Sequence, residues 1–515
     1  MKKTAEEFEL KVDLTEIEMA ALRRRAVLRS LGTGPAATRW LRSIYFDTPD
    51  HHLSQQGAAL RLRKVDDRWI QTVKIGGGVV AGVSRLLECE AEVSGPELDP
   101  SAIANVRVRK AVIAALDSGE LAPVFETRIR RTTRPLQTSC GETAELALDV
   151  GEIIAGEARR PIIEAELELL SDDPSAIFSL AEQIFDGAPM RFARYNKAAR
   201  GFQLARGEEE PDRIAERAET RLLTPDHSVE TAFEAIFRDC LRMIAANASL
   251  VMDDDGPEGP HQLRVGLRRL RSAIKSFRPA LRRTPMKDVE RAARDWARVL
   301  GELRDADVLA EEIVAPAAEA MGKSCGLLLE ALEAHRTQTR AAVRRRLVTE
   351  RFGAFSLDLA AAVETRRWAP KKKQIRKALK QAVQPFAAVA LQNAWDDVAS
   401  WGNRIDELTT PERHEMRKAL KTFRYAVDFF SPAFDPDDVK DFGKILRKLQ
   451  NGFGFLNDLA TAEGLPDLFI DHPEQKRLQK LAGKVVDWHE ERAHETWDKA
   501  VSRWRSLSKA PKFWL

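Results

Sequence analysis

Charged side chains of both signs recur at every second position along several segments of the first half of the chain. Residues i, i+2 and i+4 of a β-strand face the same side. In each segment the positions between the charged ones are mostly apolar, so the pattern predicts strands with one charged face and one apolar face. The charged sets are Glu7, Glu9 and Lys11; Arg61 and Arg63; Glu88, Glu90 and Glu92; Arg128 and Arg130; and Glu164, Glu166 and Glu168.

These charged faces have two interpretations. In a half-buried sheet they are simply the face in contact with water, which is a common arrangement. If the strands close into a barrel, one face of each strand lines the interior, where unpaired charges cannot pack as a dry core. Carboxylate oxygens suit Mg²⁺ or Mn²⁺, whereas guanidinium and ammonium groups suit phosphate oxygens. Because several strands carry acids and bases together, we favour an interior that binds a metal-bound polyphosphate.

The elements that must position these side chains are short strands interrupted by a few helices. The candidate strands are Glu7–Leu14, Arg39–Phe46, Ala58–Val65, Trp69–Ile75, Arg85–Val93, Ala122–Thr132, Ala144–Ile154 and Pro161–Leu170. Helical periodicity appears at Thr15–Ser30, Pro100–Asp117 and Pro174–Phe185. Residues 1–205 are therefore predicted to form an α+β domain that is rich in strands.

Length and composition set the wider frame. A chain of 515 residues is too long for one hydrophobic core, so two or three domains of about 100–200 residues are expected. No apolar run approaches the roughly 20 residues that span a bilayer, and the N-terminus lacks the apolar stretch of a secretory signal. Cys89, Cys140, Cys240 and Cys325 are far apart and lack metal-ligand spacing, which predicts free thiols in a reducing compartment. A cytoplasmic location is therefore expected.

The two halves of the chain differ in charge and in pattern. Residues 1–225 carry a net charge of −4 and residues 226–515 a net charge of +7. The polar segment 206–226 is predicted to be a linker. Beyond it, Leu, Ala and Arg recur at helical spacing, so residues 227–510 are predicted to be almost entirely helical. The basic excess favours anionic partners, although an ordinary helical surface would also account for it.

The helical half repeats itself with an offset of 153 residues. The matching pairs are His261 with His414, Arg264 with Arg417, Arg268 with Lys421, Arg271 with Arg424, Phe277 with Phe430, Gly301 with Gly454, and Asp305 with Asp458. One constant shift covers all of them without a gap. Chance agreement of His, Gly, Phe and Asp at a single offset is hard to obtain, so we predict a duplicated helical unit related by a pseudo-two-fold axis.

Each copy carries a cationic stripe along one helix. At 100° per residue, His261, Arg264, Arg268 and Arg271 fall on one face, and His414, Arg417, Lys421 and Arg424 repeat the stripe. An anion bound along the stripes would offset the repulsion between like charges. The alternative is that the arginines pair with acids on neighbouring helices, such as Asp305, Asp307 and Asp458. We favour the anion because the whole stripe is duplicated together with its histidine.

Several motifs in the first half occur in an order that resembles a known family. They are Glu7-x-Glu9-x-Lys11, Tyr45-Phe46-Asp47-Thr48-Pro49, Leu60-Arg61-Leu62-Arg63, Thr72-Val73-Lys74, Arg85 with Glu88 and Glu90, Asp149-x-Gly151, Glu164-Ala165-Glu166-Leu167-Glu168, and Asn196-Lys197-Ala198-Ala199-Arg200-Gly201. This ordered set resembles the CYTH superfamily of triphosphate tunnel metalloenzymes. Arg85 departs from the family pattern because it lies one residue further from the acids than expected, and Asn196 replaces a serine.

The resemblance implies an α+β fold with an eight-stranded antiparallel β-barrel, a tunnel that binds a triphosphate together with Mg²⁺ or Mn²⁺. It implies catalytic roles for Glu7, Glu9, Lys11, Glu164 and Glu166. It implies substrate binding by Arg61, Arg63, Lys74, Arg85, Arg128 and Lys197, and metal binding by Glu7, Glu9, Glu164 and Glu166. Glu88 and Glu90 are assigned to the metal as well, although a role at the phosphates stays open. Arg130 is added to the substrate-binding set and Glu168 to the metal-binding set because each shares the inward parity of its strand.

The second half resembles the CHAD domain, the conserved histidine α-helical domain, over residues 227–510. The motifs are His261-x-x-Arg264-Val265-x-x-Arg268-x-x-Arg271, Leu300-Gly301-x-x-Arg304-Asp305-x-Asp307-Val308, and their counterparts around His414 and Gly454. The resemblance implies two pseudo-symmetric helical bundles around a basic groove or pore that binds inorganic polyphosphate. It assigns this binding to His261, Arg264, Arg268, Arg271, His414, Arg417, Lys421 and Arg424.

Both halves together predict a metal-dependent inorganic triphosphatase that yields diphosphate and phosphate and that also binds inorganic polyphosphate. Two alternatives stay open: a non-catalytic polyphosphate-binding or granule-associated protein, and a triphosphatase acting on thiamine triphosphate or nucleoside triphosphates. No membrane partner is expected. Nucleic acid is not expected either, because no aromatic stripe accompanies the basic one. The expected locations are the cytoplasm and polyphosphate granules.

Overall fold

The structure is a computed structural model that describes residues 3–208, 214–220 and 222–515. Two compact units make up the chain. The first consists of the chain up to Glu216 together with Ala245–Asp254 and Leu347–Arg366. The second consists of Arg217–Ile244, Asp255–Arg346 and Arg367–Leu515. The chain passes from the first unit to the second within the segment predicted as a linker, part of which lies outside the described residues.

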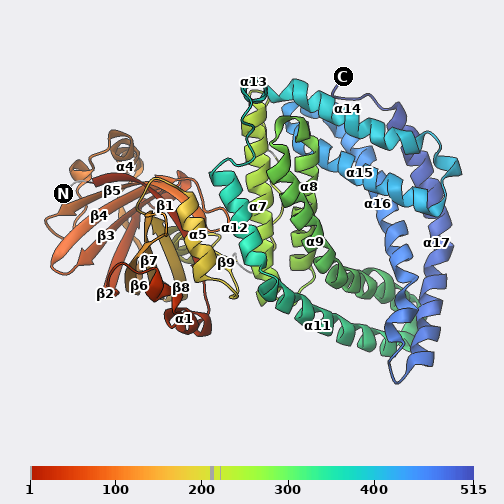
Figure 1. The fold of residues 1–515 in the computed structure, drawn as a ribbon, viewed down its shortest axis with the longest axis horizontal. Helices are drawn as coiled ribbons and strands as arrows, with labels where there is room; N and C mark the ends of the chain where they lie inside the picture. The colour runs from red at the N-terminus through yellow and green to blue at the C-terminus, as the bar shows by residue number, and fades with distance from the viewer. Residues whose placement is uncertain (1–2, 209–213, 221) are drawn as a thin grey trace. The chain divides into compact units, whose positions relative to one another are not determined.

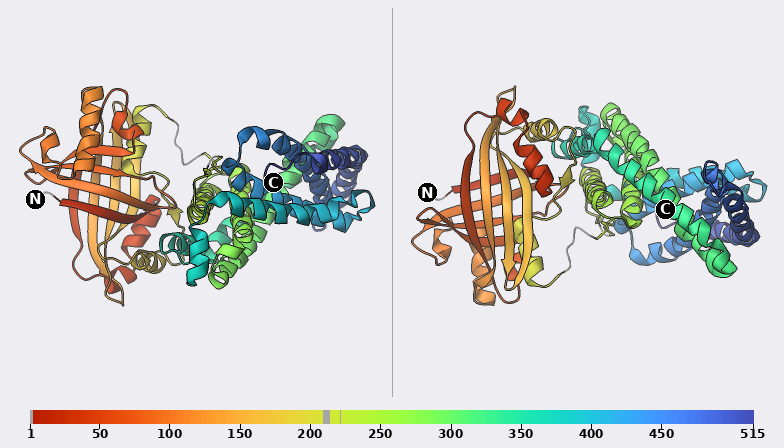
Figure 2. Two further views of the ribbon diagram at one scale, coloured as in Figure 1. Left: turned by 90° about the horizontal axis from the view of Figure 1, so that it is seen from above. Right: turned by 90° about the horizontal axis from the view of Figure 1, so that it is seen from below.

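The first unit is built around an antiparallel sheet (Figure 1). Its strands are β1 (Lys3–Asp13), β2 (Ala37–Asp47), β3 (Ala58–Val65), β4 (Arg68–Gly76), β5 (Val83–Val93), β6 (Ala122–Gln137), β7 (Thr143–Ala155), β8 (Ala158–Leu169) and β9 (Arg191–Phe192). The order is β5-β4-β3-β2-β6-β7-β8-β1, and β1 also pairs with β5, so eight strands close into a barrel. The short β9 pairs with β1. Figure 2 shows the strands curving around a common axis. The prediction of a closed eight-stranded antiparallel barrel is confirmed.

The apolar faces of the strands are covered by helices on the outside of the barrel. These helices are α1 (Glu16–Arg23), α2 (Val27–Ser30), α3 (His52–Gln55), α4 (Val106–Ser118) and α5 (Ser175–Ile184). Phe8 of β1 meets Phe178 of α5, with ring centroids 6.2 Å apart. Leu62 of β3 belongs to the same buried cluster as Val108 and Val112 of α4. Because the hydrophobic core lies between the barrel and these helices, the other strand faces are free to be charged.

A sixth helix, α6 (Lys197–Ala205), brings one functional side chain to the barrel. Its first residue follows Asn196, whose side-chain oxygen accepts a hydrogen bond of 2.8 Å from the backbone N–H of Ala199. Lys197 is consequently fixed at the first position of the helix, and it is 7% exposed. A Cβ atom at Gly201 would lie 2.1 Å from the ring of Phe125, so only glycine lets the helix approach the barrel this closely.

The rest of the chain is mostly helical, as predicted. The helices are α7 (Val229–Asp253), α8 (Glu258–Ser276), α9 (Arg283–Val308), α10 (Ala315–Met321), α11 (Gly326–Thr349), α12 (Phe352–Glu364), α13 (Lys373–Leu379), α14 (Val383–Gly402), α15 (Thr410–Phe430), α16 (Pro436–Ala462) and α17 (Gln475–Lys509). A π-helical segment, Leu309–Val314, joins α9 to α10. The helices that carry the cationic stripes are α8 and α15.

The helices recur at the spacing of the sequence repeat. Shifted by 153 residues, α8 overlies α15 and α9 overlies α16, to within one residue at each end. Phe277 and its repeat counterpart Phe430 touch, with ring centroids 5.2 Å apart. Phe233 and its counterpart Phe386 lie against them, 5.2 Å from Phe277 and 6.3 Å from Phe430 respectively. Contact between equivalent residues places this aromatic cluster where the two copies meet.

Two further features bear on the predicted setting of the protein. Among the described residues, no helix combines the length and the apolarity needed to cross a bilayer. The four cysteines are free thiols, of which Cys140 is exposed and the others are buried. Burial raises the pKa of the Cys240 thiol to about 12, so this group is protonated at neutral pH.

Candidate active site

The opening motif and the late acidic motif face each other inside the barrel. Glu7, Glu9 and Lys11 of β1 are only 8%, 3% and 4% exposed. In the antiparallel register Lys11 lies opposite Glu166 of β8, and Glu9 lies opposite Glu168. Pairing of β1 with β8 therefore brings together groups that are 155 residues apart in the sequence. The predicted inward orientation of these side chains agrees with the structure.

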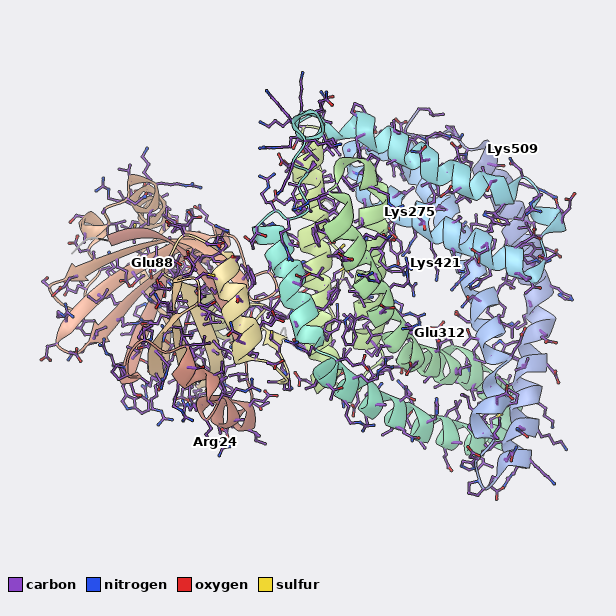
Figure 3. All side chains as sticks on the ribbon, viewed as in Figure 1. Arg24, Glu88, Lys275, Glu312, Lys421 and Lys509 are labelled. Carbon is purple, nitrogen blue, oxygen red and sulfur yellow. The ribbon has the colours of Figure 1, made fainter. Side chains whose placement is uncertain are left out.

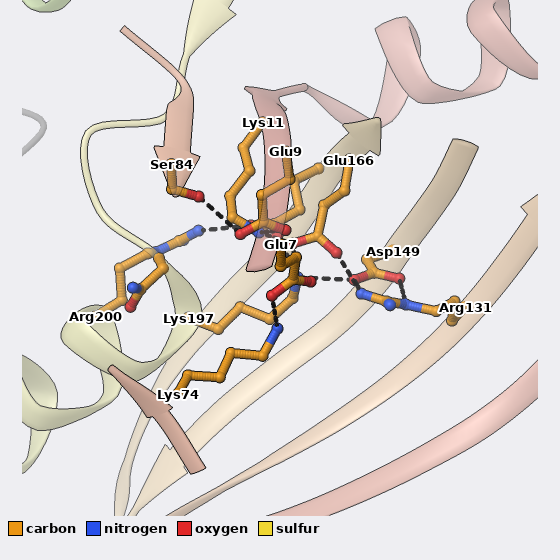
Figure 4. A network of polar contacts seen from close by, with 12 residues as sticks. Glu7, Glu9, Lys11, Lys74, Ser84, Arg131, Asp149, Glu166, Lys197 and Arg200 are labelled. Atoms are coloured by element: carbon orange, nitrogen blue, oxygen red, sulfur yellow. Dashed lines mark hydrogen bonds and ion pairs between the residues drawn. The ribbon is translucent and has the colours of Figure 1, made fainter. Parts of the chain in front are cut away.

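Three carboxylates meet at the centre of this network (Figure 4). One oxygen each from Asp149, Glu164 and Glu166 lies within 4.8 Å of the others, and all three residues are buried. The ammonium group of Lys197 lies among them: its Nζ is 2.8 Å from Asp149 and 2.8 Å from Glu166, and it also contacts Glu164. A single positive charge thus bridges three negative ones.

Two further cations hold this cluster. Arg131 of β6 donates from Nε and Nη2 to the two oxygens of Asp149, at 2.8 and 2.6 Å, and it also contacts Glu166. Lys11 contacts Glu166 and lies 2.7 Å from Glu9. The fork of Arg131 fixes the plane of the Asp149 carboxylate, since bidentate pairing restricts orientation as well as distance. The carboxylates are therefore preorganised.

The donor set fits a hard divalent cation. Mg²⁺ and Mn²⁺ prefer carboxylate oxygens, and three such groups converge here in a buried position. The same three carboxylates contact the Lys197 ammonium. A metal ion and this ammonium would therefore compete for these carboxylates, so we expect binding of the ion to displace Lys197.

Strands β3 and β4 supply a cationic wall. Lys74 hydrogen-bonds to Glu7 and lies 3.2 Å from Glu88, and the Nη2 of Arg61 lies 3.8 Å from the same Glu88. The Nε of Arg61 is buried and has no hydrogen-bond partner among the described residues. A buried donor without a partner is costly, and an anion in the lumen would satisfy it.

Burial and neighbouring charges shift the pKa values of the lumen groups in different directions. Burial opposes ionisation of Glu166, but Lys11 and Lys197 hold the pKa of this carboxyl well below its ordinary value. By contrast, burial and the charge of Glu7 raise the pKa of Glu168 to about 7. On the basic wall, burial and the charge of Arg61 lower the pKa of Arg63 to about 9. Positive charge is thus incompletely neutralised at Arg63, whereas Glu7 and Glu88 raise the pKa of Lys74 despite its burial.

These groups surround a cavity of about 510 Å³, within the range typical of small-molecule sites. Its charged and polar lining includes Glu7, Glu9, Lys11, Tyr45, Arg61, Arg63, Lys74, Arg131, Glu145, Glu166, Glu168 and Lys197. Two further predicted residues do not line the cavity but contact residues that do: Glu88 pairs with Lys74, and Glu164 contacts Lys197. Glu90 accepts a hydrogen bond of 3.2 Å from Thr72, which is not a lining residue.

Arg85 does not reach the lumen, so its expected inward orientation is wrong. Its guanidinium lies over the ring of Phe8, 4.4 Å from the centroid, on the outer face of the barrel. Arg85 precedes Glu88 by three positions, and an odd separation puts two residues on opposite faces of a strand. The inward position two residues before Glu88 is Leu86, which lines the cavity. The one-residue departure of Arg85 from the family spacing thus places this side chain outside the lumen.

Arg128 and Arg130 also face outward, contrary to expectation. The Arg128 side chain is 52% exposed and pairs with Glu126 at 2.5 Å, and Arg130 is exposed. The inward position on β6 is Arg131, which the sequence reading missed. The sequence prediction assumed that the inward positions of β6 are the charged ones. One part of the lumen is apolar, however, so apolar residues of β6 such as Phe125 point inward.

The apolar part of the lumen is an aromatic cluster. Tyr45 of β2 stacks on Phe125 of β6 with centroids 4.4 Å apart, and Phe202 of α6 meets Phe125 edge-on at 5.1 Å. The Asp149-x-Gly151 motif was the signal for the third member of the carboxylate cluster, yet the sequence alone did not show that Asp149 faces inward. Register with Glu164 of β8 settles its face.

In the second unit the cationic stripes of α8 and α15 converge. Arg264 and Arg268 come from α8, and Arg417 and Lys421 come from α15; Lys421 is labelled in Figure 3. Burial and the charges of Arg268 and Arg417 lower the pKa of Lys421 to about 6. Burial also lowers the pKa of Arg417 to about 10, although Asp458 opposes this effect. Side chains from both copies therefore form one basic cluster.

Acidic partners neutralise this cluster only in part. Arg264 pairs with Asp305 at 3.1 Å, whereas the other three cations have no ion-pair partner within the described part of the chain. Asp307 pairs instead with Arg336 of α11 at 2.7 Å, and Asp458 forms no ion pair among the described residues. Pairing with neighbouring acids, the alternative considered for the stripes, therefore applies to one of the four.

The remaining predicted residues differ from one another in exposure and in their partners. His261 is partly buried, and burial lowers its pKa. His414 is exposed. Arg271 has a buried Nε without a hydrogen-bond partner among the described residues, and Arg424 lies 3.7 Å from Asp428 of the same helix. Helical periodicity identified the stripes. Which of their residues form the shared cluster depends on how the two copies pack against each other.

Comparisons with known proteins match the two halves of the chain separately. The family model of the CYTH domain matches residues 5–202, and that of the CHAD domain matches residues 235–465. A protein of Haemophilus influenzae named inorganic triphosphatase is 33% identical over 166 residues, which cover 32% of this chain and 46% of that protein. The chain thus matches a little less than half of that relative. The solved CHAD domain of the plant Ricinus communis is 26% identical with a TM-score of 0.50, covering 57% of this chain and 98% of that domain.

Proposed function

We propose that this chain, which joins a CYTH domain to a CHAD domain, is a metal-dependent triphosphatase that cleaves inorganic triphosphate to diphosphate and phosphate inside its barrel. The similarity to a protein named inorganic triphosphatase supports this substrate. Because the match spans less than half of that relative, the substrate rests on the site as much as on the similarity.

One observation carries the proposal: a cationic wall and a three-carboxylate cluster share one closed lumen. A bare oligophosphate would be attracted by Arg61 and Lys74 but repelled by the acids, and a bare metal ion would meet the opposite situation. A metal-bound triphosphate offers both charges at once, so it complements the whole lining. Buried charges of both signs are otherwise expensive to maintain.

The chain supplies the ligands for Mg²⁺ or Mn²⁺ from Asp149, Glu164 and Glu166. A bound ion supplies neutralisation of phosphate charge and lowers the pKa of a coordinated water. The other predicted ligands, Glu7, Glu9, Glu88, Glu90 and Glu168, line or adjoin the same lumen and stay proposals for a second ion.

The cationic residues bind and orient the phosphates. Arg61 and Arg63 present planar donors that match phosphate oxygens, and Lys74 adds a point charge. Lys197, once displaced from the carboxylates, is close enough to the lumen to join them. In phosphoryl transfer the protein contributes mainly position and electrostatic stabilisation. Side chains held by strand register deliver both because they need little reorganisation.

We further propose that the basic cluster of the second unit binds inorganic polyphosphate. Its support is that Arg268, Arg417 and Lys421 lack ion-pair partners among the described residues, while burial and the charges of the two arginines lower the pKa of Lys421. A chain of phosphates would relieve this repulsion along its whole length. Binding of this kind is electrostatic and is weakened by salt.

Phosphate release by the full chain tests the proposed activity. Inorganic triphosphate, ATP and thiamine triphosphate are each supplied with Mg²⁺ or Mn²⁺. Inorganic triphosphate is expected to give the highest kcat/KM, and chelation with EDTA is expected to abolish release. Faster hydrolysis of ATP or thiamine triphosphate would reassign the substrate. Binding of triphosphate without release from any of the three would favour the alternative of a non-catalytic sensor.

A further inference from the structure

A second pocket lies on the outer wall of the barrel, outside the lumen. It has a volume of about 300 Å³ and is formed by α1, α2 and the outer faces of β2, β6 and β7. Its polar lining consists of Arg23, Arg130, Arg134, Thr38 and Thr132. Arg24, which is labelled in Figure 3, directly follows Arg23, the last residue of α1. Arg130, which the tunnel does not use, thus belongs to another site.

The pocket contains three guanidinium groups and no acid. Neither Arg23 nor Arg130 has an ion-pair partner within the described part of the chain, and no lining residue is Asp or Glu. Arg134 donates from Nη1 to the carbonyl oxygen of Leu28 at 3.3 Å, which leaves its other donors directed elsewhere. Burial and the charge of Arg130 lower the pKa of Arg23, so the two cations are near enough to repel each other.

Strand register builds the rest of the pocket. Thr38 of β2 and Thr132 of β6 are cross-strand partners, and their hydroxyl oxygens lie 3.0 Å apart. Buried Leu146 and Leu148 of β7 form an apolar wall beside them. Arg130 and Thr132 share one face of β6 because they are two residues apart. Hydroxyl and guanidinium donors therefore converge on one small concave space.

We propose that this outer pocket is a second anion site that binds a short phosphate group, either free diphosphate or the end of a polyphosphate chain. Guanidinium forks match phosphate oxygens in bidentate geometry, and the one hydroxyl proton that the Thr38–Thr132 hydrogen bond does not use can be donated to a remaining oxygen. A bound anion removes the repulsion between Arg23 and Arg130. The proposal depends only on the residues of this pocket and does not require that the lumen hydrolyses triphosphate.

Isothermal titration of the full chain with diphosphate, in EDTA to exclude metal-dependent binding in the lumen, tests the proposal. The double variant Arg23→Ala with Arg130→Ala is expected to lose one binding site relative to the parent, or to bind there at least about tenfold more weakly, since hydrogen bonds to charged groups are the strong ones. Arg128→Ala is the matched control, because it removes the same charge from the same face of the same strand outside the pocket. Unchanged binding in the double variant, or an equal loss in the control, would overturn the proposal.

Two further arms identify the ligand and its geometry. Titration with long-chain polyphosphate shows the source: a site lost for both ligands indicates chain ends, and a site lost for diphosphate alone indicates the free anion. Arg23→Lys with Arg130→Lys keeps the charge but removes the planar forks, so it is expected to restore binding only partly. Full restoration would contradict bidentate recognition. All arms are run without metal, so their outcome is independent of whether the lumen is catalytic.

Discussion

The lumen of the barrel and the basic cluster of the helices treat their cations in opposite ways. In the lumen, Lys11 and Lys197 contact carboxylates, and despite burial the surrounding acids raise the pKa of both groups. In the helical cluster, Lys421 has no acidic partner among the described residues, and burial with neighbouring arginines lowers its pKa to about 6. The first arrangement suits a ligand that carries both signs of charge, and the second suits a ligand that carries only negative charge.

Because of this difference, we expect the lumen to select its ligand by shape and charge pattern, and the helical cluster to attract anions in general. Side chains in the lumen are held by strand register and by each other, so a ligand must match fixed positions. The side chains of the helical cluster come from two copies of one stripe. Their binding energy for an anion depends mainly on the number of negative charges that they neutralise. We therefore expect geometry to control the barrel and ionic strength to control the helices.

The largest expected effect comes from removing the carboxylates. Glu164→Gln with Glu166→Gln leaves Asp149 alone of the three proposed metal ligands, and turnover of triphosphate should fall on the order of 1,000-fold or more. Steady-state phosphate release measures this. Glu152→Gln is the control, since it changes an outward carboxylate that pairs with Arg159. Nearly normal turnover in the double variant, with its fold verified by circular dichroism, would remove the metal assignment.

The next effect concerns Arg131, which acts by positioning Asp149 and Glu166. Arg131→Ala is expected to raise the Mn²⁺ concentration for half-maximal rate by about 10–100-fold, as is typical when a residue behind the ligands is lost. The metal dependence of phosphate release is the measurement, because a purely structural defect would lower the rate without shifting this concentration. Arg159→Ala, an exposed arginine on the outer face, should leave the Mn²⁺ dependence unchanged.

A smaller effect is expected in the helical cluster. Arg264→Ala with Arg417→Ala should weaken retention of long-chain polyphosphate at moderate salt by about tenfold, because each removed charge contributes modestly to an electrostatic interface. Lys418→Ala serves as the control, since Lys418 is exposed and pairs with Glu415. Raising the salt concentration should weaken this binding much more than it changes kcat/KM in the barrel. Equal salt sensitivity of the two sites would break the comparison.

The smallest expected effect is the uptake of a proton by Lys421 when polyphosphate binds. In the free protein this amine is largely neutral above pH 6, and a bound polyanion favours its protonated form. Binding therefore takes up protons above pH 6, and the affinity should fall as the pH rises, by at most about tenfold per unit for one linked proton. Titration calorimetry in two buffers of different ionisation enthalpy measures the uptake. Lys421→Met should abolish it, and uptake that persists in this variant would assign the proton elsewhere.

The sequence was most informative where pattern and register agree. Alternation located all eight barrel strands because inside and outside positions differ in polarity along most of their length. It failed on β6, where Phe125 points into an aromatic part of the lumen and Arg128 and Arg130 point out. Charged residues at every second position show that they share one face of the strand, but not whether this face points into the barrel. Pairing with the neighbouring strands determines which face points inward.

The helical half shows the same limit in another form. Periodicity and the 153-residue offset predicted a pair of equivalent helices that carry the stripes, and α8 and α15 are that pair. They did not show which members of the stripes meet, because that depends on how the copies pack around Phe277 and Phe430. Arg268 and Lys421 lie within the shared cluster, whereas His414 is exposed. Tertiary contact, which a local pattern does not encode, makes this selection.

Anomalous X-ray diffraction from crystals of the full chain grown with Mn²⁺ and diphosphate tests the central claim most directly. We predict a manganese peak among Asp149, Glu164 and Glu166, phosphates against Arg61 and Lys74, and the Lys197 ammonium withdrawn from the carboxylates. Manganese and anion found only outside the barrel, with Lys197 still bridging the three acids, would contradict it.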